Sequence, residues 1–370
     1  MKKLVIPILL VSLILTACGA VQSATQAEGD APERVELSYA KEFTIDKYQG
    51  GSTLLTIGEN RYLVVPENGE CPEDVPEGTL VLQRPIENVY LQATSAMDLI
   101  CAIDALGHVR LSGTQESGWY VPAAAEAMAR GDILYAGKYS APDYETILEN
   151  GCRLAIESTM ILHKPEVIEQ LSKLGVPTLI ERSSYENDPL GRPEWIKLYG
   201  VLFGKEELAE RVFEEKTAAV RELLNSAPTG KTAAFFYING TGSVTVHKPG
   251  GYVSRMVELA GGRYLPEGET KNDSALSTEN MQLESFYAAA RDADVLIYNS
   301  AIDGGITSLE ELCAKCEVLH DFKAVREGNV WCTDRSLFQQ SMSLGELIAD
   351  MHAVFTEDET AKLRFLYKLN

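Results

Sequence analysis

Positive charge is scarce in this 370-residue sequence. It holds 33 lysine and arginine residues against 54 acidic residues, which gives a net charge of −21. Because binding to phosphate backbones depends on dense lysine and arginine, nucleic acid is not an expected partner. After residue 17 the sequence also lacks any apolar run long enough to cross a bilayer. These two absences exclude the nucleic-acid-binding and multi-span membrane classes.

Motifs of the common catalytic centres are missing as well. The sequence contains no G-x-S-x-G, no H-E-x-x-H and no G-x-x-x-x-G-K pattern. Its five histidines show no arrangement of a base beside a nucleophile. We therefore do not expect an enzyme.

The first residues have the pattern of an export signal. Lys2 and Lys3 precede the apolar run Leu4–Leu15, and small residues with Cys18 follow it directly. The letters LTAC resemble the lipobox of bacterial lipoproteins, and that resemblance implies that Cys18 becomes a lipidated N-terminus. The small, polar and acidic residues up to Arg34 are typical of a flexible tether. We expect an extracytoplasmic protein that is lipid-anchored to the outer face of the bacterial cell membrane.

One long helix is predicted over Lys205–Ser226, KEELAERVFEEKTAAVRELLNS. Its apolar residues recur at spacings of three and four and form one stripe. Gly204 ends the preceding helical segment, and Pro228 with Gly230 stops this one. A helix of this length spans roughly 30 Å, the width of a small domain.

Strand and helix patterns alternate on both sides of that helix. Such alternation predicts parallel strands joined by right-handed helical crossovers. The expected fold class is therefore α/β: two Rossmann-like lobes with mainly parallel sheets, joined by one long α-helix. Ahead of them, Thr53–Ile57 and Arg61–Val65 predict an N-terminal β-hairpin embellishment. The expected segments are a signal peptide at 1–17, a tether at 18–34, an N-terminal lobe at 35–190, linking helices at 191–228 and a C-terminal lobe at 229–370.

From about residue 85 to 355 the chain resembles the solute-binding lipoproteins of ABC importers for iron–siderophore complexes, haem and cobalamin. The resemblance lies in the order of five stretches. They are ATSAMDLICAIDALGHVRLSGT, GKYSAPDYETIL, LYGVLFGKEELAE, MQLESFYAAARDADVLIY and FKAVREGNVWCTD. It implies two lobes that open little around one helix, a ligand held in the cleft between them, and an ABC permease dimer as partner. We expect a monomer that has no cofactor of its own.

Glu145 and Glu284 each lie near the start of a predicted helix, one in each lobe. The resemblance implies that these carboxylates dock onto arginines of the two permease subunits. The alternative is that each is a helix-start carboxylate favoured by the helix dipole.

The cleft residues follow from a rule for parallel sheets, in which ligands meet the loops at the carboxyl ends of the strands. Aromatic rings in those loops suit a macrocycle or a catechol, and arginines suit anionic groups of a chelate. The ligand-binding candidates are Ser95, Met97, Trp119, Tyr120, Glu157, Arg182, Tyr185, Tyr237, Tyr252, Asn299 and Arg335.

Cys313, Cys316 and His320 fall at i, i+3 and i+7 of one predicted helix and would share a face. We favour two half-buried thiols and a surface histidine over a metal site, because tetrahedral zinc needs a fourth ligand. The pairing of the cysteines is left open.

An iron–siderophore or related ferric complex is the leading ligand. Cobalamin, another corrinoid or haem is the alternative within the same role. The choice stays open because the fit of a chelate depends on loop geometry. The alternative classes are an exported lipid-anchored enzyme and a structural or adhesive lipoprotein.

Overall fold

The structure is a computed structural model that describes residues 31–370 apart from 224–226, 269–276 and 303. The predicted signal peptide, the lipidation residue Cys18 and nearly all of the predicted tether lie outside the described residues. In the part that is described, no helix has the length and apolar character needed to cross a membrane.

The N-terminal region forms a five-stranded sheet, in the order β1-β2-β3-β4-β5. Neighbouring strands are antiparallel from β1 to β4, and β5 returns parallel to β4. The predicted hairpin is the β3–β4 pair, but the sheet around it is larger than the sequence indicated. The strands are β1 (Glu33–Val35), β2 (Phe43–Lys47), β3 (Thr53–Ile57), β4 (Asn60–Val65) and β5 (Leu80–Gln83).

The second sheet, which we call the N-lobe sheet, is entirely parallel in the order β12-β11-β6-β7-β8. Side chains alternate along its strands between two cores: Leu91 and Ile156 face one, Tyr90 and Ala155 the other. Its strands are β6 (Val89–Leu91), β7 (Val109–Ser112), β8 (Leu134–Tyr135), β11 (Ala155–Ser158) and β12 (Thr178–Glu181), and its helices are α1 (Thr94–Ala102), α2 (Pro122–Ala129), α3 (Tyr144–Glu149) and α4 (Pro165–Lys173).

The third sheet, the C-lobe sheet, is mixed. Its centre, β15-β13-β17-β18, is parallel, whereas β14, β16 and the C-terminal β19 pair antiparallel. Phe235 and Phe236 again face two separate cores. The strands are β13 (Thr232–Ile238), β14 (Val244–His247), β15 (Arg263–Leu265), β16 (Thr278–Met281), β17 (Val295–Tyr298), β18 (Val330–Thr333) and β19 (Leu366–Lys368), and the helices are α8 (Tyr252–Leu259), α9 (Leu283–Ala290), α10 (Leu309–Lys315), α11 (Lys323–Arg326) and α12 (Leu344–Thr356).

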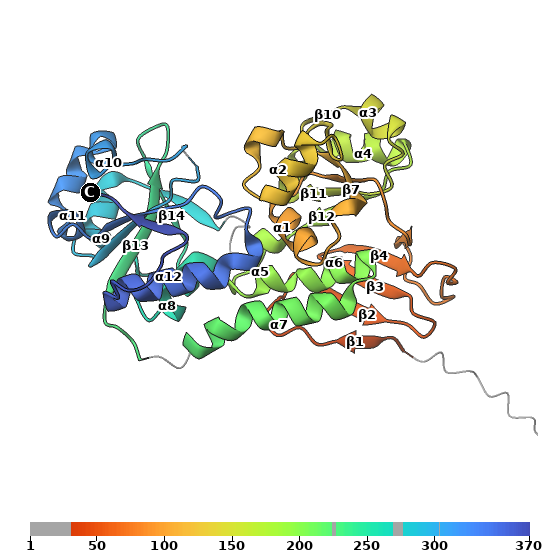
Figure 1. Ribbon diagram of the computed structural model, residues 1–370, viewed down its shortest axis with the longest axis horizontal. Helices are drawn as coiled ribbons and strands as arrows, with labels where there is room; N and C mark the ends of the chain where they lie inside the picture. Colours follow the sequence, from red (N-terminus) through yellow and green to blue (C-terminus); the bar gives the residue numbers. More distant parts are fainter. Residues whose placement is uncertain (1–30, 224–226, 269–276, 303) are drawn as a thin grey trace, which may run out of the picture. The chain divides into compact units, whose positions relative to one another are not determined.

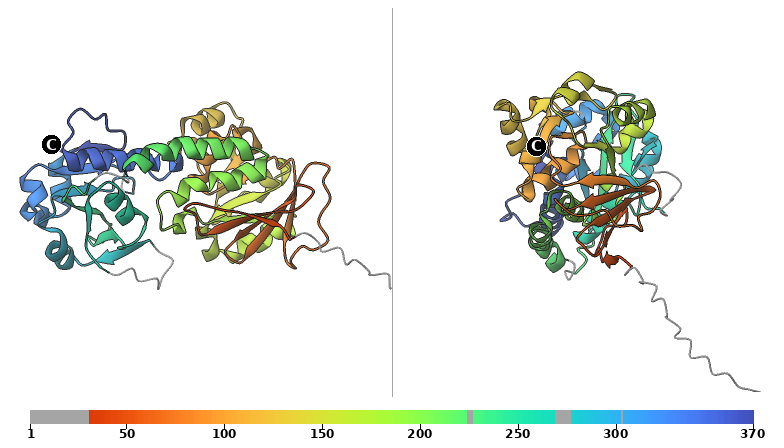
Figure 2. Two further views of the ribbon diagram at one scale, coloured as in Figure 1. Left: turned by 90° about the horizontal axis from the view of Figure 1, so that it is seen from below. Right: turned by 90° about the vertical axis from the view of Figure 1, so that its right-hand side faces the viewer.

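Three helices follow β12 in the chain: α5 (Gly191–Glu194), α6 (Ile196–Phe203) and α7 (Glu206–Leu223). Helices α6 and α7 lie against each other (Figures 1 and 2). The first half of α7 packs into the core shared with the N-lobe sheet through Ala209 and Phe213. Its second half packs into a C-lobe core through Val220. The long helix therefore contributes to both cores, and residues 224–226 of its predicted span lie outside the described residues.

Helix α12 approaches α7 closely at Gly345. A Cβ atom at that position would lie 2.7 Å from Val220 Cγ2 and 3.3 Å from the carbonyl oxygen of Lys216. Only glycine allows this approach without movement of α7. The contact joins the closing helix of the C-lobe to the long helix.

Two buried carboxylates fix the N-terminal sheet to α5 and to the segment before it. Glu194 accepts hydrogen bonds from the backbone N–H groups of Ser38, Tyr39 and Ala40 at 2.7–2.8 Å. Glu186 accepts those of Lys41 and Glu42 at 2.9 and 3.0 Å. These five bonds join segments about 150 positions apart, so the appended sheet is an integral part of the fold.

One predicted helix is wrong. The sequence predicted one helix that carries Cys313, Cys316 and His320, but α10 ends at Lys315 and Cys316 has extended backbone angles. A short 3₁₀ helix, Glu317–Asp321, follows. Cys313, Cys316 and His320 therefore do not share one helix face, and no cluster of metal-ligating side chains occurs among residues whose placement is described.

Candidate functional site

The parallel strands place a set of loops at the carboxyl edges of the two lobe sheets. In the N-lobe these loops follow β6, β7, β11 and β12, and in the C-lobe they follow β13, β17 and β18. Such edges are where open α/β sheets bind ligands. The candidate site is therefore built from these loops.

After β6, the first turn of α1 carries Ser95 and Met97. Ser95 donates a hydrogen bond to Glu181 Oε2 at 3.3 Å, at the end of strand β12, which β11 separates from β6 in the sheet. Met97 is fully buried in the core beneath the sheet. Ser95 thus lies at the loop edge, while Met97 packs below it.

The loop after β7 separates two adjacent aromatic residues. Trp119 is 6% exposed, and its Nε1 donates a hydrogen bond to Ser112 Oγ at 3.2 Å. Tyr120 is 40% exposed. Of the two rings, only Tyr120 offers a surface to a ligand in this conformation, and Trp119 holds the loop onto β7.

Glu157 lies in β11 and is completely buried. Neither carboxylate oxygen has a hydrogen-bond partner among the described residues. Burial raises the pKa of this carboxyl to about 8. A carboxyl in that environment is favoured in its neutral form.

Arg182, directly after β12, already has partners. Its Nε donates to Glu42 Oε2 at 2.9 Å, and its guanidinium lies 4.5 Å from the centroid of the Tyr185 ring. The loop after β12 is therefore tied to the N-terminal sheet through a residue 140 positions away.

In the C-lobe, Tyr237 lies within β13 opposite Thr245 of β14. Asn299 is buried, donates its backbone N–H to Phe236 O at 2.8 Å, and accepts a hydrogen bond from the backbone N–H of Ala301 at 3.2 Å. These contacts hold the start of the loop after β17. Tyr252 begins α8 and is buried beneath the guanidinium of Arg192, 4.4 Å from its ring centroid.

Arg335, two residues after β18, differs from Arg182. It is exposed, and no described acidic residue lies within ion-pair distance of it. A Cβ atom at Gly305 would lie 2.7 Å from Arg335 Nε, so the guanidinium rests on the loop after β17. Gly305 has φ +91°, which favours glycine there. Two C-lobe loops thus meet at an exposed cation.

Sequence analysis missed three exposed apolar side chains at these edges. Met160 and Leu162 lie in the 3₁₀ helix Thr159–His163 that follows β11, and Ile302 lies in the loop after β17; they are 47, 50 and 54% exposed. The signal was present in the letters STMIL, where apolar residues continue past the end of a strand. Together with Tyr120 they give both sheet edges apolar surface.

Hydrogen bonds join the loop after β18 to N-lobe segments. The Gln339 side chain accepts from the backbone N–H of Tyr120 and donates to the carbonyl of Gly118, both at 2.8 Å. Ser341 Oγ donates to Ser95 O at 2.9 Å. One glutamine amide therefore pairs with the backbone of the opposite loop, and sequence reasoning had no signal for it.

The two predicted docking residues occupy equivalent positions. Glu145 is the second residue of α3 and Glu284 the second residue of α9, and both are exposed. Neither forms an ion pair with a basic residue among those described. Both carboxylates are therefore open to an external cation.

A cavity of about 590 Å³ lies at the opposite edge of the C-lobe sheet, where its parallel strands begin. Its walls include the starts of β13, β17 and β18. Lys231 pairs there with Glu357 and Lys323 with Asp294, both at 2.6 Å. Because the parallel strands begin at this edge and both of these lysines are already paired, we do not place the functional site in this cavity.

Comparison with known families gives a clear assignment. The model of the periplasmic binding protein family matches residues 100–337. The chain belongs to the periplasmic binding protein family. This family model covers well over half of the sequence, from α1 to the loop after β18.

This periplasmic binding protein is also similar to individual proteins. An uncharacterized lipoprotein of Methanocaldococcus jannaschii is 23% identical over 366 residues, covering 88% of this chain and 85% of its own. A periplasmic heme-binding protein of Pseudomonas aeruginosa is 17% identical, with coverages of 77 and 98% and a TM-score of 0.58. The catecholate-siderophore-binding protein VctP of Vibrio cholerae is 14% identical, with coverages of 86 and 100% and a TM-score of 0.56. The two solved structures share the fold.

Proposed function

We propose that this protein is the extracytoplasmic solute-binding component of an ABC importer and captures an iron–siderophore or related ferric complex. The proposal rests on one observation: exposed apolar side chains and an exposed arginine lie in the loops at the carboxyl ends of the parallel strands. Those side chains are Tyr120, Met160, Leu162, Ile302 and Arg335.

The chemistry of this surface fits a chelate. Apolar and aromatic side chains cover the flat organic faces of such a ligand, and an arginine contacts anionic oxygens through paired N–H donors. The protein from Pseudomonas aeruginosa is named as heme-binding and that from Vibrio cholerae as catecholate-siderophore-binding, and both share this fold. These likenesses support a metal chelate as the ligand class.

Haem or a corrinoid is the second candidate. Met160 and His163 lie three residues apart in a 3₁₀ helix, where side chains at that spacing lie on the same side. Both are exposed at the end of β11. A thioether and an imidazole are ligands that iron accepts in haem proteins, so this short helix favours a metal with an open axial position.

The test is to purify the full-length chain in detergent and record the absorption spectrum and mass of any co-purifying molecule. Thermal unfolding is then measured with added ferric siderophores, haem and cobalamins. We expect one chelate class to raise the unfolding midpoint at micromolar concentration without being converted. Stabilisation by none of them, or turnover of any of them, would contradict the proposal.

We further propose that the chain is anchored through lipid on Cys18 and delivers its ligand to a permease dimer. Support comes from the export pattern of the sequence, the lipoprotein relative and the two exposed carboxylates Glu145 and Glu284. Because α7 packs into both cores, we propose that it limits the opening of the lobes. The proposed divisions stay at 35–190, 191–228 and 229–370.

A further inference from the structure

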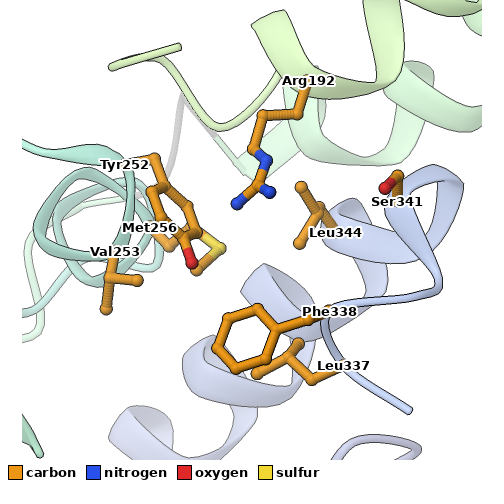
Figure 3. A pocket seen from close by; sticks show the side chains of 8 residues that line it. All are labelled: Arg192, Tyr252, Val253, Met256, Leu337, Phe338, Ser341 and Leu344. Atoms are coloured by element: carbon orange, nitrogen blue, oxygen red, sulfur yellow. The ribbon is translucent and has the colours of Figure 1, made fainter. Parts of the chain in front are cut away.

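The chain passes from one lobe to the other in α7 and again near its C-terminal end. The second passage is residues 337–344, which we call the crossing segment and which lies between β18 and the first residue of α12. Leu337 and Leu344 at its two ends pack into a C-lobe core against α8 (Figure 3). Met342 between them is 4% exposed and packs into the core of the N-lobe sheet. The chain therefore enters the N-lobe core and returns within one short segment.

Two glutamine side chains of the crossing segment bind the loop after β7. The Gln339 amide accepts from the Tyr120 N–H and donates to the Gly118 carbonyl, both at 2.8 Å. Gln340 Nε2 donates to the Tyr120 carbonyl at 3.3 Å, and its Oε1 accepts from Arg364 Nη2 at 2.7 Å. Both backbone polar groups of Tyr120 are therefore held by side chains of the C-lobe.

The next two residues of the crossing segment bind the start of α1, which follows β6. Ser341 Oγ donates to the Ser95 carbonyl at 2.9 Å. The Met342 N–H donates to Asp98 Oδ2, also at 2.9 Å. Every residue from Gln339 to Met342 is therefore hydrogen-bonded to the N-lobe.

These contacts differ from a simple approach of two exposed surfaces. Hydrogen bonds between exposed groups contribute little, because water replaces each of them when the surfaces separate. Met342 instead buries an apolar side chain in the core that also contains Met97 of α1. Because the buried side chain and the hydrogen bonds lie on the same short stretch, they are expected to break together as one local opening.

We propose that the crossing segment is a second connection between the lobes, in addition to α7, and that its Gln339 positions the loop that carries Tyr120. Arg335 lies on the same stretch of chain, two residues after β18. The exposed cation of the C-lobe and the exposed ring of the N-lobe are therefore linked through a few residues. The lobes separate at this edge only after the Gln339 hydrogen bonds break and Met342 leaves the N-lobe core.

A second connection restricts how the lobes move. A single helix allows its two ends to bend and rotate relative to each other, and a further link between the lobes opposes both motions. The loops after β6, β7 and β18 therefore keep their relative positions in the ligand-free protein. The value of this arrangement for binding rests on the proposed function, whereas the connection itself is present without a ligand. Experiments on the ligand-free protein therefore test it independently of the proposed function.

Amide hydrogen exchange of the ligand-free, full-length protein tests the role of Gln339. Gln339→Ala removes the two side-chain bonds but leaves the Met342 N–H and its acceptor Asp98 in place. We expect the Met342 amide to exchange about tenfold faster than in the wild type, because the crossing segment opens as a unit. Gln83→Ala is the matched control, since the Gln83 amide also donates to backbone carbonyls but within the N-terminal sheet. Unchanged exchange at Met342 in Gln339→Ala, or an equal increase in the control, would overturn the proposal.

The buried methionine supplies the second arm. Met342→Ala and Met256→Ala each remove a buried methionine side chain, the first from the N-lobe core and the second from a C-lobe core. We expect both variants to unfold at a lower temperature, but only Met342→Ala to speed exchange of the Tyr120 amide, by about tenfold or more. Equal exchange at Tyr120 in the two variants would show that Met342 is an ordinary core residue and overturn the second connection. Gln339→Ala removes no fully buried side chain, so the first arm decides the proposal even if Met342→Ala does not fold.

Discussion

Arg182 and Arg335 each lie just past the carboxyl end of a parallel strand, but they have different environments. In the N-lobe, Arg182 is held by Glu42 and Tyr185. In the C-lobe, Arg335 is exposed and unpaired among the described residues, resting on the backbone at Gly305. The appended N-terminal sheet supplies the partner that one arginine has and the other lacks. A cation after a strand is therefore available to a ligand only when no distant segment has already neutralised it.

The largest expected effect tests the two lobes together at their exposed carboxylates. Glu145→Ala with Glu284→Ala removes one proposed ion pair from each lobe. Each lost pair costs about 2 kcal/mol or more, so permease association falls by about three orders of magnitude. Import in cells should stop, while ligand affinity of the purified protein stays unchanged. Glu149→Ala, at the other end of α3, is the control, and normal uptake by the double variant would refute the docking role.

The next prediction compares two buried groups whose pKa values are shifted in opposite directions. Burial raises the pKa of Glu157 in the N-lobe to about 8, and lowers that of His247 in the C-lobe to about 3. The folded state binds the Glu157 proton more tightly than the unfolded state does, so stability falls as pH rises from about 4.5 to 8. For His247 the unfolded state binds the proton more tightly, so stability falls as pH drops from about 6.5 to 3.

Two substitutions distinguish the loss of stability at high pH from the loss at low pH. Glu157→Gln should reduce the loss of unfolding free energy above pH 5, and His247→Phe should reduce the loss below pH 6. Each reduction should be roughly 3–5 kcal/mol at most. Denaturant unfolding between pH 4 and 9 measures both. If stability falls above pH 5 in Glu157→Gln as steeply as in the wild type, Glu157 is not buried in the folded protein as a neutral acid.

The arginine comparison gives a smaller effect on binding. Arg335→Gln should weaken chelate binding by about 10- to 100-fold, since hydrogen bonds from a charged donor contribute about 1.5–3 kcal/mol. Arg182→Gln should leave affinity within about twofold, because its half-buried pair with Glu42 contributes on the order of 1 kcal/mol or less, and to stability only. Titration calorimetry of both variants checks this, and equal losses would remove the distinction between the lobes.

Much of the fold was accessible from the sequence because its signals are local. The alternation of strand and helix periods predicted the α/β class, and the apolar stripe from Ala209 to Leu223 predicted the long helix. Distant partners have no such signal. Glu186 and Glu194 hold backbone N–H groups about 150 positions away, so the sequence indicated a hairpin where a five-stranded sheet exists.

The candidate site was less predictable because exposure depends on the whole fold. Trp119 and Tyr120 are neighbours in sequence, yet one ring is buried and the other exposed. Met160 was not among the predicted site residues, but the chain turns into a 3₁₀ helix at the end of β11 and leaves it at the surface. Residue type at a strand end therefore identifies a loop but not which side chain a ligand can reach.

Two equally exposed apolar residues of the N-lobe provide the smallest and most specific test. Met160, at the end of β11, is 47% exposed, and Leu148, on α3, is 49% exposed. If apolar surface at the strand ends binds the chelate, Met160→Ser should cost about 1 kcal/mol of binding free energy, or about fivefold in Kd. Leu148→Ser removes a similar exposed area away from these loops and should leave Kd unchanged. Equal effects of the two substitutions on chelate titrations would show that position at the strand end has no special role, and the ligand would then have to contact a different surface.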